Sequence, residues 1–189
     1  MTPDEVLALL ERHGSLLHGH FKLSSGRHSD VFVQKFRVLE RPRAARALGE
    51  ALAGRFERAF DVVAAPAVGA VVLGFCTALA ADARSIFAER SGGALTFRRG
   101  FSVHPGERVL VVEDVITTGG SAREVVELVR AAGAEPIGVG ALIDRSMGNA
   151  DLGVRLEALA ELPVASWEAD SCPQCARGEP LDDPGSRRL

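Results

Sequence analysis

Hydrophobic and polar positions alternate in two different ways near the start of the chain. Apolar residues first recur at helical spacing, directly after Thr2, which can cap a helix, and Glu5, which would complete a capping box. Residues 16–38 instead place single apolar residues among polar ones, with a turn at 24–26. The pattern predicts a short helix followed by a pair of short strands.

From residue 42 onward, segments typical of helices alternate with apolar runs typical of strands. Helices are expected over 42–58, 70–81 and 121–132, and strands over 61–65, 85–88, 109–112 and 136–143. Residues 90–106 are rich in glycine and arginine and are expected to form a mobile loop or ribbon. Strands that alternate with helices form parallel sheets covered on both faces, so the sequence predicts an α/β fold.

Composition places the chain among ordinary globular proteins and leaves room for one domain over 1–189. Hydrophobic residues make up 47% and charged residues 25% of its 189 residues. No apolar run approaches the roughly 20 residues that span a bilayer, and the N-terminus lacks the pattern of a secretory signal. We therefore expect a cytoplasmic protein without a membrane partner. The net charge of −3 also argues against a nucleic-acid partner, because such proteins usually carry a basic excess.

Positive charge is concentrated in one part of this acidic chain. Residues 84–108 contain five arginines and two glutamates. Such a segment suits a small anionic ligand, and the alternative is a solvated loop. Lysine occurs only at Lys22 and Lys35, whereas arginine occurs twenty times, so both lysine positions merit attention.

One strand-to-helix junction carries the most informative motif. The apolar run at 109–112 is followed by two carboxylates and then by a Thr/Gly loop that leads into a helix. Glycines in such a loop let backbone N–H groups approach an anion, and the helix directs the positive end of its dipole at the same point. The pattern predicts a cradle for a monophosphate. Its residues are Val115, Ile116, Thr117, Thr118, Gly119, Gly120 and Ser121.

The two carboxylates before the loop are Glu113 and Asp114. They would repel a phosphate in direct contact, but one sugar-length away they can accept hydrogen bonds from ribose hydroxyls and help to position Mg²⁺. We therefore expect both to be catalytic. The loop has no Walker-type lysine, which disfavours a P-loop nucleotidase. The alternative is an ordinary turn with a good helix cap.

The segment 109–121 resembles the phosphoribosyl-pyrophosphate signature of type I phosphoribosyltransferases. The resemblance implies the fold of that family: a parallel sheet flanked by helices, a small N-terminal hood to which residues 1–40 contribute, and a mobile basic loop. The signature does not specify the base that is used, and some members of the superfamily are only regulators.

Two further segments are similar to orotate phosphoribosyltransferases. They are Phe21-Lys22-Leu23-Ser24-Ser25-Gly26 with Ser29-Asp30, and Ile143-Asp144-Arg145. The resemblance implies that Lys22 reaches the pyrophosphoryl donor, that Phe32 and Thr117 contact the base, and that Arg145 pairs with the orotate carboxylate. A planar guanidinium matches a carboxylate through two parallel hydrogen bonds. The alternatives are a solvated hairpin charge for Lys22 and a surface arginine for Arg145.

The expected reaction joins orotate to phosphoribosyl pyrophosphate and releases orotidine 5'-monophosphate and pyrophosphate, in de novo pyrimidine (UMP) biosynthesis. The resemblance also implies Mg²⁺ as cofactor and a homodimer with shared active sites. Arg90 is then the catalytic, donor-binding residue that acts on the partner's site. The family's loop carries more basic residues at its start than this one does, so the roles of Arg98, Arg99 and His104 stay open. Segment 66–69 also lacks the family's lysine.

Two rival functions share parts of this pattern. A purine phosphoribosyltransferase would keep the phosphate cradle without needing a carboxylate-binding arginine. A regulator that senses phosphoribosyl pyrophosphate and binds RNA or DNA would be expected to carry a basic excess or an added helix-turn-helix.

The three cysteines, Cys76, Cys172 and Cys175, do not suggest a disulfide framework, because their number is odd and no signal peptide is present. The Cys-x-x-Cys spacing of the last two is only half of a typical zinc site. We expect residues 170–189 to form an irregular structural tail and assign no metal ligand there.

Overall fold

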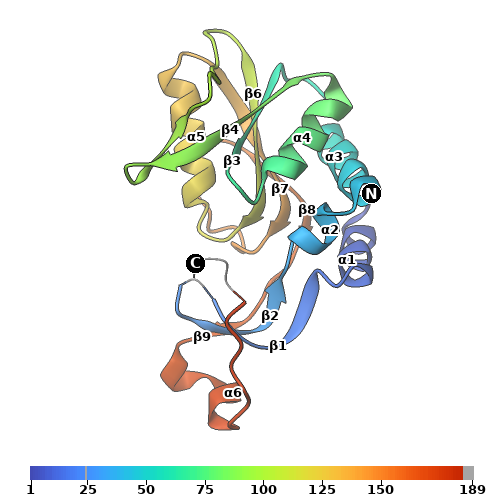
Figure 1. Cartoon of the computed structure of the whole chain (residues 1–189), viewed down its shortest axis with the longest axis vertical. Coiled ribbons are helices and arrows are strands. Elements are labelled where there is room, and N and C mark those ends of the chain that lie inside the picture. The colour runs from blue at the N-terminus through green and yellow to red at the C-terminus, as the bar shows by residue number, and fades with distance from the viewer. Residues whose placement is uncertain (24, 185–189) are drawn as a thin grey trace.

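The computed structural model describes residues 1–23 and 25–184 and contains two sheets (Figure 1). Ser24, in the predicted turn, and the last five residues of the predicted tail lie outside the described residues. The large sheet has the order β5-β4-β3-β6-β7-β8 and the small one β1-β2-β9. The strands are β1 (Leu16–Lys22), β2 (His28–Val33), β3 (Val62–Pro66), β4 (Arg84–Ser91), β5 (Ala94–Phe97), β6 (Arg108–Ile116), β7 (Glu135–Asp144), β8 (Leu156–Glu161) and β9 (Ser166–Trp167). The helices are α1 (Pro3–Arg12), α2 (Phe36–Leu39), α3 (Pro42–Arg55), α4 (Val71–Ala81), α5 (Gly120–Ala131) and α6 (Pro173–Ala176), with a 3-10 turn η1 (Ala169–Ser171).

The central strands of the large sheet are parallel and covered on both faces, which confirms the predicted α/β fold. Strands β4, β3, β6, β7 and β8 pair in parallel, and β5 is added antiparallel at one edge. Helices α1, α3 and α4 pack on one face and α5 packs on the other (Figure 1). Along β6 the buried side chains alternate between these two cores, as a pleated strand requires.

Two expected boundaries were wrong. The second predicted strand does not continue to residue 38, because residues 36–39 form the short helix α2. Strand β6 does not stop before the carboxylates but continues to Ile116, so that Glu113 and Asp114 lie within the strand. The extension is explained by β7, which runs alongside far enough to pair with Ile116 through Asp144.

Strand β8 was not expected from the sequence. Its residues, Leu-Glu-Ala-Leu-Ala-Glu, have high helix propensity. They form a strand because they pair along the exposed edge of β7, with Val139 opposite Leu156. Here the tertiary context overrides local propensity.

The basic segment 84–108 begins as an antiparallel ribbon, β4 and β5, which turns at two glycines of positive φ, Gly92 and Gly93. Most of its arginines are paired with carboxylates of the same chain. The pairs are Arg84–Glu107, Arg90–Glu124, Arg99–Glu89 and Arg108–Asp61. Within residues 1–23 and 25–184, Arg98 is the one arginine of the segment without an ion pair. The excess charge of this ribbon is therefore largely compensated.

The described part of the tail returns to the small sheet. Residue Asp182 forms a bridge beside Phe21, and its backbone exchanges hydrogen bonds of 2.8 Å with His20 and Lys22 on β1. Helix α6 lies between η1 and this bridge. No helix in the described residues is both long and apolar enough to cross a membrane.

Candidate active site

The loop between β6 and α5 has the geometry of an anion cradle. Gly119 adopts a φ of +78°, and a Cβ atom there would lie 2.5 Å from Cδ2 of Leu152, so that only glycine fits. Helix α5 then begins at Gly120 without a side-chain cap, and the first N–H groups of a helix have no partner within it. Thr117 and Thr118 are exposed beside them. These donors and the helix dipole converge where the sequence predicts a phosphate.

The two carboxylates at the end of β6 are buried and closely held. Asp114 accepts a hydrogen bond from the N–H of its neighbour Val115 at 2.6 Å. It also forms an ion pair with Lys35, whose Nζ lies 3.0 Å from the carboxylate. Glu113 accepts a hydrogen bond from the Asp114 N–H at 3.0 Å. Burial, together with the adjacent negative charge of Asp114, raises the pKa of Glu113 to about 8. Glu113 therefore keeps its proton near neutral pH.

The loop after β3 closes over Asp114. A Cβ atom at Gly69 would lie 1.9 Å from Oδ2 of Asp114, so this backbone touches the carboxylate only because residue 69 is glycine. Segment 66–69, which lacks the family's lysine, therefore places its backbone against this carboxylate.

Lys35 was given no role from the sequence, yet it lies at the site. It directly precedes α2 and places its ammonium on Asp114, with the ring of Phe36 5.5 Å away. The scarcity of lysine was the only signal that could have identified it. The other lysine, Lys22, is the last residue of β1.

Arg145 directly follows β7 and is anchored next to the phosphate loop. Its backbone N–H donates to the carbonyl of Ile116, the last residue of β6, at 2.8 Å. Its Nε atom is buried and has no hydrogen-bond partner among the described residues, and burial lowers the pKa of its guanidinium. A buried, unpaired donor of this kind is costly unless an anion satisfies it.

The remaining predicted residues lie on other elements. Lys22 and Phe32 belong to the β1–β2 hairpin, where the Phe32 ring packs 5.8 Å from that of Phe21. In Figure 1 the small sheet lies below the large sheet and faces the end at which α5 starts. Arg90 lies on the ribbon, where its side chain is exposed and contacts the carbonyl of Gly93 at 2.5 Å and Glu124 of α5 at 3.2 Å.

Comparison with known proteins places this arrangement in a family. The model of the phosphoribosyl transferase domain family matches residues 37–152. An orotate phosphoribosyltransferase from Pelotomaculum thermopropionicum is 50% identical over 190 residues, covering 100% of both chains. One from Thermotoga maritima is 48% identical over 186 residues, covering 97% of this chain and 99% of the relative. The crystal structure of orotate phosphoribosyltransferase from Aeropyrum pernix has a TM-score of 0.72 at 28% identity, covering 83% of this chain and 93% of that one. The chain therefore belongs to the phosphoribosyltransferase family and, within it, to the orotate phosphoribosyltransferases.

Proposed function

We propose that this protein transfers the phosphoribosyl group of phosphoribosyl pyrophosphate to orotate, in the de novo synthesis of pyrimidine nucleotides. Identity of 50% to an orotate phosphoribosyltransferase over the whole chain supports the activity. The observation that carries the choice of base is Arg145. Its buried Nε lacks a partner one strand away from the phosphate loop, and the carboxylate of orotate would supply one in a planar, bidentate pair.

The donor would be held by the residues around the loop. The 5'-phosphate lies in the cradle at 115–121, and the ribose hydroxyls lie against Asp114 and Glu113. Because Lys35 and Gly69 already hold Asp114, that carboxylate is oriented before the ribose arrives. The neutral Glu113 can donate a hydrogen bond as well as accept one. Lys22, from the hairpin, would reach the pyrophosphate.

The reaction exchanges one bond at C1 of the ribose for another. The bond from C1 to the pyrophosphate oxygen breaks and its electron pair leaves with pyrophosphate. The N1–C1 bond forms, with Thr117 beside the two reacting atoms, and the proton of orotate N1 passes to water or to the departing pyrophosphate. Positive charge develops on the ribose in between, and the carboxylate of Asp114 at the end of β6 would stabilise it.

The residues at this site also fit Mg²⁺. Asp114 and, once it has lost its proton, Glu113 offer hard carboxylate oxygens next to the phosphate cradle, and Mg²⁺ is usually bound by one or two carboxylates together with substrate phosphates and water. When bound, the ion would neutralise charge on the departing pyrophosphate.

An absorbance assay tests the activity and separates it from its rivals. Orotate, uracil and adenine are each offered with phosphoribosyl pyrophosphate and Mg²⁺. Uracil is the matched control, because it is orotate without the carboxylate. We expect turnover of orotate alone. A purine phosphoribosyltransferase would consume adenine, and a regulator would bind the donor without consuming any base.

We further propose that the protein is a homodimer with shared active sites. One face of α4 exposes Val72, Phe75 and Leu79, whose accessible fractions are 40%, 58% and 61%. Their spacing places them in one stripe along the helix. An apolar stripe of this kind is typical of a protein interface, and a second copy of the chain is the partner that the family resemblance implies.

A further inference from the structure

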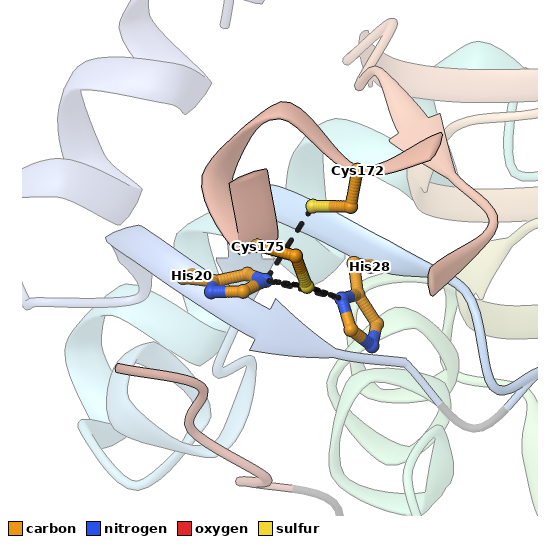
Figure 2. A group of neighbouring side chains, drawn as sticks. All are labelled: His20, His28, Cys172 and Cys175. Carbon is orange, nitrogen blue, oxygen red and sulfur yellow. Dashed lines mark hydrogen bonds between the residues drawn. The ribbon is translucent and has the colours of Figure 1, made fainter. Parts of the chain in front are cut away.

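Two cysteines of the tail and two histidines of the small sheet meet at one point (Figure 2). His20 lies on β1 and His28 is the first residue of β2, whereas Cys172 directly precedes α6 and Cys175 lies within it. Nε2 of His20 is 3.1 Å from Nδ1 of His28, and it is 3.5 and 3.6 Å from the sulfur atoms of Cys172 and Cys175. The Cys175 sulfur is 3.2 Å from Nδ1 of His28.

These separations are close to those of a tetrahedral zinc site. Zinc–sulfur bonds of about 2.3 Å and zinc–nitrogen bonds of about 2.0–2.1 Å place the ligand atoms of a tetrahedron roughly 3.3–3.8 Å apart. The four candidate ligand atoms all lie within 4.8 Å of one another, and the four measured pairs are between 3.1 and 3.6 Å. An ion could therefore enter with little movement of the backbone.

The hydrogen bonding of His20 also prepares it to bind a metal. Its Nδ1 lies 3.0 Å from the backbone carbonyl of Glu179, and a carbonyl can only accept. Nδ1 therefore carries the proton, and Nε2 directs its lone pair at the three other groups. A metal-bound histidine characteristically donates its second ring nitrogen to a carbonyl or carboxylate in this way. A cation at the centre would satisfy the converging nitrogen and sulfur atoms together.

The chemistry of the four side chains indicates which metal the cluster would bind and what role that metal would have. Thiolate and imidazole ligands favour zinc over the hard Mg²⁺ ion of the proposed reaction. Four protein ligands leave no open position, as in structural rather than catalytic zinc sites. His20, His28 and Cys172 are buried. A redox pair of cysteines would need neither histidine, so it does not account for the cluster.

We propose that His20, His28, Cys172 and Cys175 bind a structural zinc ion that fixes the C-terminal tail to the β1–β2 hairpin. The same hairpin carries Lys22, which stands opposite His28 in the strand register. The tail also contacts β1 where Gln174 donates to the carbonyl of Gly19 at 2.9 Å and where Asp182 bridges to Phe21. The ion would hold the substrate-binding hairpin near its turn, at the end away from Leu16 and Val33, where the hairpin joins the rest of the chain.

The first test measures the metal in the unaltered protein. The chain is expressed without a histidine tag in zinc-supplemented medium and purified with a reductant. Elemental analysis should find about one zinc per chain. Replacement by Co²⁺ should give the intense visible bands of a tetrahedral ion and a thiolate-to-cobalt charge-transfer band. A protein free of zinc, or a cobalt spectrum without the thiolate band, would overturn the proposal.

Variants with matched controls test the ligands. His20→Asn keeps a donor for the carbonyl of Glu179 but removes the ligand nitrogen, and the exposed His18 on the same strand gives the control His18→Asn. Cys172→Ala and Cys175→Ala are compared with Cys76→Ala on α4. The ligand variants should lose their zinc and unfold at a lower temperature, whereas both controls keep the metal. A zinc-selective chelator should lower the unfolding temperature of the parent protein and of both controls, but not that of the ligand variants. Zinc retained at full occupancy in the ligand variants would contradict the assignment.

Discussion

At the scale of single residues, the most constrained group in the proposed site is the carboxylate of Asp114. It is bounded by the Lys35 ammonium, by the backbone of Gly69 and by the N–H of Val115. Each contact removes a rotational choice from the side chain before any substrate is present. Fixed dipoles and charges that need no reorganisation are an effective source of transition-state stabilisation.

Arg145 provides the sharpest test of base recognition. Arg145→Ala should raise the Michaelis constant for orotate much more than that for phosphoribosyl pyrophosphate, because the guanidinium is proposed to pair with the base and not with the donor. Loss of one partner of a buried charge pair costs about 2–5 kcal/mol. Steady-state kinetics with each substrate varied in turn measures both constants. Arg123→Ala, which removes an exposed arginine paired with Asp151, is the control. Equal changes in both constants would argue against the assignment.

Glu113 should make the stability of the substrate-free protein depend on pH. Its pKa is raised from 4.5 to about 8, so the folded state binds more protons than the unfolded state between these values. The free energy of unfolding therefore falls as pH rises from about 4.5 to about 8, and the loss is complete above that. Glu113→Gln removes this dependence while Asp114 and Lys35 stay in place.

Denaturant unfolding at several pH values measures this effect. The stability of Glu113→Gln relative to the parent should increase with pH, by an amount on the order of a few kcal/mol. Glu127→Gln on the exposed side of α5 should show no such trend. A difference between parent and Glu113→Gln that stays constant with pH would show that Glu113 is not held protonated.

At the scale of elements, the junction between β6 and α5 places the two carboxylates next to the phosphate loop. The carboxylates lie near the carboxyl end of the strand, and the helix starts where the phosphate is expected. Ligands in open parallel sheets bind at the carboxyl ends of the strands for this reason. Arg145 lies at the same end of the sheet, because it directly follows the neighbouring strand β7, whose last residue Asp144 pairs with Ile116.

Two adjacent glycines at this junction should respond differently to the same change. Gly119→Ala would force a Cβ to 2.5 Å from Leu152 at a positive φ, and should lower stability by about 1–3 kcal/mol and weaken donor binding. At Gly120 the nearest atom to a new Cβ is Thr118 Oγ1 at 3.8 Å, so Gly120→Ala should fold normally. Thermal unfolding and donor titration measure both variants. Equal stabilities of the two would contradict the steric role of Gly119.

At the scale of the whole molecule, the proposed dimer would give Arg90 a role at the neighbouring active site. In the single chain Arg90 pairs with Glu124 rather than with the phosphate loop. This exposed pair is worth little in water, so Arg90 can exchange it for a pyrophosphate on the neighbouring subunit.

Mixing two inactive variants tests whether the sites are shared. If Arg90→Ala and Asp114→Asn subunits damage different sites, each mixed dimer has one intact site and one doubly damaged site. Random remixing should then restore about a quarter of parental activity, because half of the dimers are mixed and each has one good site of two. Mass spectrometry verifies subunit exchange. If exchange is complete and no activity returns, Arg90 does not act across the interface.

The sequence by itself determined the features that depend on residues close together in the chain. The capping box at Thr2 and Glu5, the alternation of helices with strands and the phosphate loop are all local patterns, and each is present in the structure. Arg145 could be proposed from its motif and the family resemblance, although the lack of a partner for its Nε became visible only with the fold.

Only the tertiary structure decided which distant residues meet. Lys35 reaches Asp114 across three helices and three strands of intervening chain, β8 forms because the edge of β7 is available, and Cys172 lies 152 residues from His20. A pattern in the sequence reports neighbours along the chain, whereas a charge pair or a set of metal ligands requires neighbours in space. From the sequence the Cys-x-x-Cys motif was only half of a typical zinc site, and no metal ligand was assigned there. Folding brings His20 and His28 next to it, which is why the zinc site is proposed from the structure alone.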